Sequence, residues 1–267
     1  MLLSEDEASP LGQSGSDGPS PFFIVCDHAG NLIPRALDAL GLPAAELTRH
    51  IAWDIGAAGV AQRLGAALGA PTLWQRYSRL VIDCNRPLDA PDSIARVSER
   101  TVIPGNQAVG PTAAEARAQE IFRPYHDEIR RRLDLRAAAG RPTVLVAMHS
   151  FTPRYLDAAR PWHVGVLYNQ DARLARPLLQ ALRDEGDLVV GDNQPYAGSE
   201  LTDYSIVNHG ERRGLPYVEI EIRQDLIADE AGQAAWATRL ARLLPLAAGQ
   251  AISEIKDRLP RTQPSPD

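Results

Sequence analysis

Short apolar runs alternate along the chain with longer stretches in which apolar side chains recur at helical spacing. The short runs predict strands over residues 22–26, 78–83, 143–148, 163–168 and 217–223. The helical spacing predicts helices over 54–68, 112–139, 171–184 and 230–248, with Pro124 interrupting or kinking the second of them. Strands that alternate with helices predict an α/β fold with a mainly parallel or mixed central sheet flanked by helices.

The two ends of the chain differ in composition from the region between them. Residues 1–20 are acidic and rich in Ser, Gly and Pro, without the basic start and apolar stretch of a secretory signal. We predict a flexible N-terminal tail over 1–20 and a flexible C-terminal tail over 259–267. No linker of that composition interrupts residues 21–258, which predicts a single domain there.

Charge and cysteine content narrow the class of protein. Lys and Arg total 28 against 34 Asp and Glu, so a net charge of −6 gives no general electrostatic reason to bind nucleic acid or an anionic membrane. No stretch approaches the roughly 20 apolar residues of a membrane span. Lys256 is the only lysine, which almost excludes a Walker or Schiff-base lysine. Two cysteines cannot form a disulfide framework and indicate a reducing compartment, so we expect a cytoplasmic protein that acts on a small molecule.

Polar side chains follow three of the predicted strands at the points where the strands end. In an open α/β sheet the ligand crevice lies outside the carboxyl ends of the strands. The residues that this rule brings to one edge are Asp27 and His28, then Asp83, Asn85 and Arg86, and finally His149 and Ser150. Packing alone does not explain why polar residues of this kind follow the ends of three separate strands. We therefore predict a functional site at this edge.

The strand predicted over 217–223 carries acidic residues at every second position. With a period of two, Tyr217, Glu219, Glu221 and Arg223 share one face of the strand, and apolar residues take the other. One interpretation is an edge strand with a solvated face, and the other is a strand whose carboxylates point into a site. Glu221 lies nearer the carboxyl end and is the better candidate for catalysis, whereas Glu219 could be the structural partner of an arginine.

The two histidines at strand ends favour a metal site. A catalytic zinc ion typically binds three protein ligands, often two histidines and one acid. His28 and His149 are the candidate histidines, and Asp54 is our choice for the acid. A helix N-cap is an equally plausible role for Asp54, and Asp27 and Asn31 are the other nearby candidates. Weaker signals come from the remaining histidines, which are His50, His126, His163 and His209.

Nucleophilic mechanisms without a metal fit the sequence less well. No G-x-S-x-G elbow occurs, and His149 and Ser150 are adjacent rather than arranged as base and nucleophile. Cys26 could act as a nucleophile with His28 two positions further on, but its place in an apolar strand predicts that it is buried. A thiol-dependent amidase is therefore a minor alternative.

Several motifs in order along residues 22–228 resemble the N-formylglutamate amidohydrolase family. They are DHAGNLIP, HIAWDIGA, YSRLVIDCNRP, TVIPGN, PYH, HSFTP, VGVLYN, GDNQPY and EIEIRQDL. The family is similar to the zinc-dependent exopeptidases and the acyl-amino-acid deacylases. The resemblance therefore implies the zinc-exopeptidase fold and hydrolysis of an N-acyl group from an acidic amino acid, with formate and L-glutamate as the products of N-formyl-L-glutamate.

The resemblance also implies roles for individual residues. His28, Asp54 and His149 would bind Zn²⁺ or another divalent metal, and Glu221 would be the general base. Asn85 and Arg86 match the Asn-Arg pair with which related exopeptidases hold the substrate carboxylate.

Two departures from the family pattern leave the substrate open. The form of the family known from histidine breakdown reads PHSG and EINR where this chain reads DHAG and EIRQ. This difference is typical of a separate subgroup. Asn31 also stands where related zinc exopeptidases place an acid three residues after the first histidine.

These observations predict a metal-dependent amidohydrolase. Glu221 would transfer protons, and Arg86 would act in catalysis by clamping the substrate α-carboxylate through a planar bidentate donor. Candidates for binding a second carboxylate are Arg79, Arg154, Arg160 and Arg223. Asn193 and Tyr196 are further candidates for substrate binding. With Tyr204 they lie in a Gly/Asn/Pro-rich stretch that could be a mobile lid or an ordinary surface loop. The alternatives are a non-catalytic binding or sensing protein and a related metallo-deacylase or carboxypeptidase with another substrate.

Overall fold

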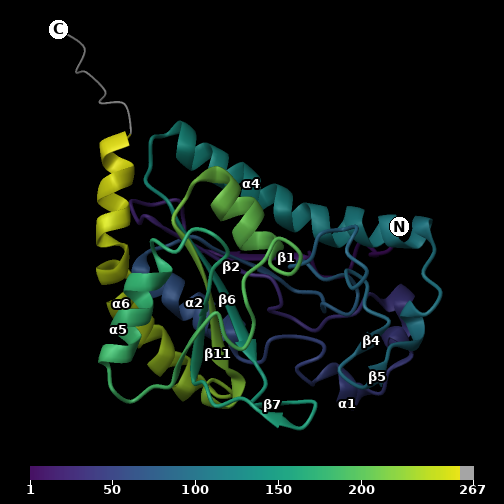
Figure 1. Ribbon diagram of the computed structural model, residues 1–267. Helices are drawn as coiled ribbons and strands as arrows, with labels where there is room; N and C mark the ends of the chain where they lie inside the picture. The colour runs from purple at the N-terminus through teal and green to yellow at the C-terminus, as the bar shows by residue number, and fades with distance from the viewer. Residues whose placement is uncertain (259–267) are drawn as a thin grey trace, which may run out of the picture.

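A seven-stranded sheet runs through the computed structural model, which describes residues 1–258 (Figure 1). Its strand order is β1-β3-β2-β6-β11-β9-β10. The strands of this sheet are β1 (Leu11–Ser14), β2 (Phe22–Cys26), β3 (Thr72–Gln75), β6 (Val144–Phe151), β9 (Val164–Leu167), β10 (Val190–Asp192) and β11 (Tyr217–Arg223). Two hairpins lie outside it, formed by β4 (Val97–Ser98) with β5 (Thr101–Val102) and β7 (Arg154–Tyr155) with β8 (Ala158–Ala159).

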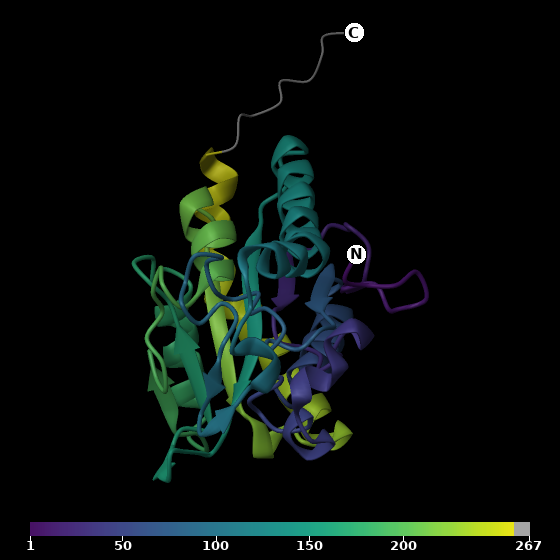
Figure 2. The same ribbon diagram turned by 90° about the vertical axis from the view of Figure 1, so that its right-hand side faces the viewer.

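Helices cover both faces of the sheet. The α-helices are α1 (Ala44–Leu47), α2 (Ala57–Leu68), α3 (Pro111–Arg117), α4 (Arg123–Ala138), α5 (Ala175–Asp184) and α6 (Glu230–Arg258). Shorter 3-10 and π segments are η1 (Arg35–Gly41), η2 (Pro104–Asn106), η3 (Ala118–Phe122), η4 (Ile206–Gly210), η5 (Glu211–Arg213) and η6 (Gln224–Leu226). The C-terminal ends of α4 and α6 lie at the opposite end of the molecule from the β7–β8 hairpin (Figures 1 and 2). No helix among residues 1–258 is both long and apolar enough to cross a bilayer.

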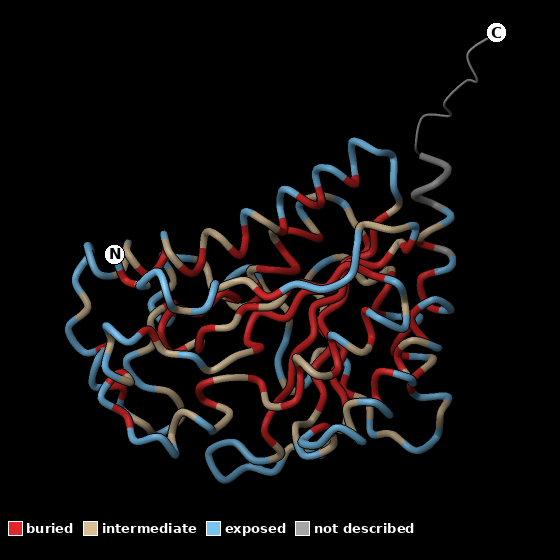
Figure 3. The backbone as a smooth tube through the Cα atoms, turned by 180° about the vertical axis from the view of Figure 1, so that it is seen from behind, coloured by how far each residue is buried: buried red, intermediate tan, exposed pale blue. Residues whose placement is uncertain are grey.

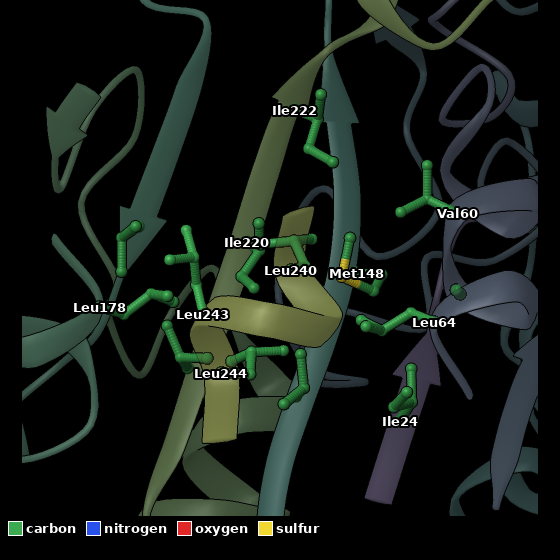
Figure 4. Close-up of a cluster of buried hydrophobic side chains, with 14 of the residues drawn as sticks. Ile24, Val60, Leu64, Met148, Leu178, Ile220, Ile222, Leu240, Leu243 and Leu244 are labelled. Atoms are coloured by element: carbon green, nitrogen blue, oxygen red, sulfur yellow. The ribbon is translucent and has the colours of Figure 1, made fainter. Parts of the chain in front are cut away.

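Side chains at alternate strand positions divide the core into two clusters. On one face, Ile24, Met148 and Ile220 pack against α2, α5 and α6 (Figure 4). On the other face, strand residues such as Leu145 pack against α4 and the loops that precede it. Figure 3 shows these buried positions concentrated along the strands. Side chains at every second position from Leu145 onward in β6 therefore point to the face that α4 covers.

The α/β class and the mixed central sheet are confirmed, and the strand directions show where the sheet departs from parallel. Neighbours among β3, β2, β6 and β11 pair in parallel, whereas β9 pairs with β11 in the antiparallel direction and β1 does so with β3. Four of the five predicted strands form close to their expected bounds. The parallel strands bring their carboxyl ends to a common edge, as the sequence predicted.

The strand predicted over 78–83 is wrong. This segment is a buried turn, in which the Ser78 hydroxyl donates to the Ala52 carbonyl at 2.7 Å and accepts from the Leu80 amide at 3.1 Å. Leu80, Val81 and Ile82 are nevertheless buried in the core. A buried turn has the same apolar composition as a buried strand, which explains the wrong prediction. The strand in this part of the chain is β3, which ends before the turn begins.

The helix predicted over 112–139 forms without a break. A π turn over η3 joins α3 to α4, and Pro124 lies in the first turn of α4. Proline is tolerated there because the π turn directly before it already alters the regular i→i−4 hydrogen-bond ladder at the point where Pro124 lacks an amide hydrogen. Pro124 therefore does not interrupt the helix.

The N-terminal segment is incorporated into the fold, contrary to the tail expected over residues 1–20. β1 extends the sheet beside β3, and Leu2 is buried. The Leu2 and Leu3 amides donate to the Glu120 carboxylate at 2.6 and 2.8 Å. The tail expected over 259–267 lies outside the described residues.

Two buried histidines, His126 of α4 and His209 of η4, stack on each other. The Nε2–H of His126 donates to the Cys84 carbonyl at 2.8 Å, so its Nδ1 is left to accept from His209 Nε2 at 3.0 Å. A second proton on His126 would remove that acceptor. Burial accordingly lowers the pKa of His126 to about 4.

We therefore expect His126 to make stability depend on pH. Its folded pKa is below the unfolded value of about 6.5, so stability from the neutral ring is complete above pH 6.5 and falls as the pH drops toward 4. The loss is on the order of 3 kcal/mol. His126→Gln should show a smaller fall in unfolding free energy over this range, measured by denaturant titration. Parallel pH curves for the variant and the native protein would contradict this expectation.

Candidate active site

The carboxyl ends of β2, β6 and β11 form the floor of a cavity of about 470 Å³. His149 lies in β6 directly opposite Glu221 in β11. Both residues occupy strand positions whose side chains point to the face that α4 covers. Both side chains therefore enter the cavity from the same side of the sheet. His28 follows the end of β2 and joins them there.

A carboxylate orients the His28 ring. The buried His28 Nε2 lies 2.7 Å from Asp83 Oδ1, which accepts its hydrogen. Its Nδ1 is buried, has no hydrogen-bond partner among the described residues, and lies 3.4 Å from Asp54 Oδ2. The loop that follows His28 fits closely, because a Cβ on Gly30 would lie 2.1 Å from the Arg76 carbonyl oxygen.

A second carboxylate orients His149 in the same manner. His149 Nε2 lies 3.0 Å from Asp27 Oδ2, and the Ser205 hydroxyl holds the other oxygen of Asp27 at 2.5 Å. His149 Nδ1 lies 2.8 Å from Asp54 Oδ2. Burial opposes a charge on this ring, but Glu219, Asp27 and Asp54 together raise the pKa of His149 well above its usual value.

Asp54 completes a three-residue cluster with the two histidines. The ligand atoms of His28, Asp54 and His149 lie within 4.8 Å of one another. The Asp54 amide donates to the His28 carbonyl at 2.9 Å, which ties the two loops together. Burial raises the pKa of Asp54, but the adjacent histidines lower it more, so the group is ionised. Asp54 is not a helix cap, because α2 begins at Ala57 with Gly56 at its N-cap.

The other acid candidates for this cluster lie elsewhere. Asp27 is on the far side of His149 from Asp54, and the Asn31 amide donates to the Leu47 carbonyl. A second group of His149, Glu219 and Glu221 also gathers potential ligand atoms. His149 Nε2 is already hydrogen-bonded to Asp27. The group of His28, Asp54 and His149 therefore leaves more ligand atoms free for a metal than the second group does.

Glu221 is a buried carboxyl group with an uncommitted oxygen. Its Oε2 has no hydrogen-bond partner among the described residues. Burial raises the pKa of Glu221 to about 7, which suits a group that exchanges protons near neutrality. Burial likewise raises the pKa of Glu219 well above its usual value, but Glu219 accepts a hydrogen bond from the Asn85 side chain at 3.2 Å.

Asn85, Arg86 and Arg79 line the cavity as the sequence predicted. Asn85 accepts from the Ser205 amide at 3.0 Å, and Arg86 donates through Nε to Asp92 at 3.0 Å. Arg79 Nη2 lies 2.8 Å from Asp83 Oδ2. Tyr196 also lines the cavity, within the segment predicted to be a lid or a surface loop.

Three predicted substrate-binding residues do not line the cavity. Arg223 pairs with Asp225 at 2.8 Å, and Arg154 donates to the Asp157 carbonyl at 2.8 Å. Asn193 accepts from the Tyr168 amide at 3.0 Å and shapes its own loop. Each of these side chains has a local partner outside the cavity.

Cys26 is buried in the core on the helix-covered face that carries Ile24. Burial raises the pKa of its thiol, which disfavours the thiolate that a nucleophile needs. The geometry thus favours the histidine–carboxylate cluster over Cys26 as the chemical centre.

Some site residues escaped the sequence analysis or were assigned no such role. Asp83 was noted only as a strand-end residue, Ser205 gave no signal, and His50 on the cavity wall was only a weak candidate. Asp27 directly precedes His28 in sequence but contacts His149. For these contacts the sequence offered one signal, which is that Asp27 is adjacent to His28, a predicted metal ligand.

Fold and site together define an α/β protein with a buried histidine–carboxylate centre in a cavity, an arrangement typical of hydrolytic enzymes. The family model for N-formylglutamate amidohydrolase matches residues 20–228, and the chain belongs to this family. The resemblance inferred from the motifs is thereby confirmed.

Two of the solved structures that match this chain belong to proteins of similar length. One is the gene product Atu2144 from Agrobacterium tumefaciens, with 37% identity, a TM-score of 0.91, and coverage of 94% of this chain and 99% of that one. The other is N-formylglutamate amidohydrolase from Ralstonia eutropha JMP134, with 18% identity, a TM-score of 0.62, and coverage of 92% and 99%. The second likeness shows the shared fold. No curated protein matches the chain.

Proposed function

We propose that this member of an amidohydrolase family hydrolyses the amide bond of an N-formyl or other N-acyl amino acid in a metal-dependent reaction. N-formyl-L-glutamate, the substrate in the family's name, is the first to assay. One observation carries the proposal. His28 Nδ1, His149 Nδ1 and Asp54 Oδ2 converge in the cavity that Glu221 also lines, and Glu221 Oε2 has no hydrogen-bond partner among the described residues.

The donor atoms fit a divalent metal. His28 Nδ1 and Asp54 Oδ2 both present lone pairs, and neither can donate a hydrogen to the other when the ring is neutral. A cation between them would satisfy both. The outer ring nitrogens are held by Asp83 and Asp27, the arrangement that usually supports histidine ligands to a metal. Two histidines and one acid are a common ligand set for catalytic zinc.

The residues around this centre supply the remaining chemistry. A bound Zn²⁺ would polarise the amide carbonyl and lower the pKa of water to about 7. Glu221 would accept a proton from the attacking water and return it to the leaving amine. Arg86 and Asn85 would hold the substrate α-carboxylate at the cavity wall. Arg79 Nη1 lies 3.6 Å from Asp54 Oδ1 and would add positive charge near a developing oxyanion.

Removing the metal should abolish hydrolysis. We expect a chelator-treated, dialysed protein to release no amine from N-formyl-L-glutamate or from a panel of N-acyl amino acids, and added Zn²⁺, Co²⁺ or Mn²⁺ to restore the rate. Elemental analysis verifies the removal. Full activity in protein shown to be metal-free would overturn the mechanism.

Glu221→Gln should reduce kcat by roughly 10²–10⁴-fold, because glutamine cannot accept the proton. Metal content should stay at the native level, since the proposed ligands are unchanged. Glu219→Gln is the matched comparison, one strand repeat away on the same face, and should lose less. An unchanged rate in Glu221→Gln, with a large loss in Glu219→Gln, would place the base at Glu219.

Asp27→Asn should weaken metal affinity by roughly 10–100-fold, because the amide no longer holds the His149 ring as a carboxylate does. The dissociation constant is measured by competition with a chromophoric chelator, independently of turnover. Asp92→Asn is the control, since Asp92 pairs with Arg86 at the rim and touches neither histidine. Equal affinities for Asp27→Asn and the native protein would show that Asp27 does not support the site.

A further inference from the structure

One cation beside the cavity has no acidic partner. Arg160 directly follows the β7–β8 hairpin, and its amide donates to the Pro153 carbonyl at 2.9 Å. A guanidinium carries five N–H donors. Among the described residues the guanidinium of Arg160 donates only to the Tyr196 hydroxyl, at 2.8 Å, and forms no ion pair. Its remaining donors are therefore available to a ligand.

Aromatic rings hold this guanidinium against the cavity. Its Cζ lies 4.8 Å from the ring centres of both Tyr155 and Tyr196 and 5.9 Å from that of Phe151. All three rings belong to residues that line the cavity, and Tyr155 and Tyr196 are 36% and 42% exposed, which places them at its rim. Cation–π contacts fix a guanidinium without neutralising its charge. Arg160 is thus a preorganised cation at the rim of the cavity.

The rim lies beyond the histidine–carboxylate centre along β6. Phe151 follows His149 by two residues in this strand, so both side chains point to the same side of the sheet. Phe151 is about 7 Å further toward the carboxyl end of the strand than His149 is. A substrate with its amide at the centre would therefore extend toward Arg160 with a group remote from that amide.

The arginines that line the cavity already have acidic partners. Arg79 lies 2.8 Å from Asp83, and Arg86 lies 3.0 Å from Asp92. In the proposed function Arg86 takes the α-carboxylate of the substrate. A second carboxylate would therefore need a cation other than these two.

The acid on the same wall is paired with a different arginine. Glu99 lies 2.6 Å from Arg49 Nη2 and 3.5 Å from His50 Nε2. Burial lowers the pKa of His50, and the charge of Arg160 adds to this shift although Glu99 opposes it. The positive charge of Arg160 thus acts on a residue of the cavity wall, while Arg160 itself is packed behind the lining rings.

We propose that Arg160 is a specificity-determining residue that binds a second carboxylate of the substrate, remote from the scissile amide. This inference rests on the proposed amide hydrolysis and names its substrate class as N-acyl amino acids with two carboxylates. The planar guanidinium would donate two parallel hydrogen bonds to that group. The carboxylate can belong to the amino-acid side chain, as in N-formyl-L-glutamate, or to the acyl group, as in N-succinyl-L-alanine.

Two pairs of substrates test the assignment, each with one carboxylate replaced by its neutral amide. N-formyl-L-glutamate is compared with N-formyl-L-glutamine, and N-succinyl-L-alanine with N-succinamoyl-L-alanine. Both members of a pair keep the scissile amide and the α-carboxylate. In at least one pair we expect the zinc-loaded native enzyme to have a kcat/KM roughly tenfold higher for the acid than for the amide. The pair that shows the preference identifies the source of the carboxylate.

Arg160→Gln should abolish this preference by lowering kcat/KM for the acid, with little change for the amide. Arg160→Met, whose apolar stem can still pack on the rings, should give the same result. Arg154→Gln is the matched control, because Arg154 lies in the same hairpin, does not line the cavity and donates to the Asp157 carbonyl at 2.8 Å. It should leave the preference at the native value. Equal losses for acid and amide in both Arg160 variants would show that Arg160 only holds the tyrosine rings in place, and would overturn the inference.

Calorimetric binding separates this inference from the proposed function. The four compounds are titrated into zinc-loaded Glu221→Gln, with and without Arg160→Gln, so that recognition is measured without turnover. Tighter binding of an acid that Arg160→Gln removes, with no hydrolysis by the native enzyme, would support the inference and overturn the function. Hydrolysis by the native enzyme with no preference for either acid would overturn the inference and leave the function standing.

Discussion

The parallel pairing of β6 with β11 is the constraint on which the site depends. Its register sets His149 directly opposite Glu221, and the pleat points both side chains to the face that α4 covers. A slip of one residue would turn a strand's polar set toward the apolar cluster under α6 and would separate the histidine from the carboxyl group. The loops that carry His28 and Asp54 then converge on a position that the sheet has already defined.

Burial of so many ionisable groups is tolerated because they compensate one another. Each histidine of the centre lies between carboxylates, with Asp83 and Asp54 around His28 and Asp27 and Asp54 around His149. An isolated buried charge would be costly, whereas a paired and hydrogen-bonded one is much less so. Glu221 Oε2 has no hydrogen-bond partner among the described residues, which supports the proposed role of Glu221 in proton transfer.

Features that depend on local periodicity could be predicted from the sequence. The alternation along β11 placed Glu219 and Glu221 on one face, and the strand ends located His28 and His149. The contact of Asp27 with His149 could not be predicted, because it joins residues 122 positions apart that only the sheet brings together. The segment over 78–83 misled for another reason, since a buried turn selects the same apolar residues as a strand.

The position of β1 has a consequence for how the molecule behaves among its own copies. An uncovered β3 would present a row of free amides and carbonyls on which a strand from another chain could add. β1 occupies that edge, and at the other edge β10 is only three residues long. The sheet thus ends on both sides in short strands, which hinders edge-to-edge aggregation. The segment before Ser20 thus covers an edge that β3 would otherwise expose, although it lies outside the matched family region.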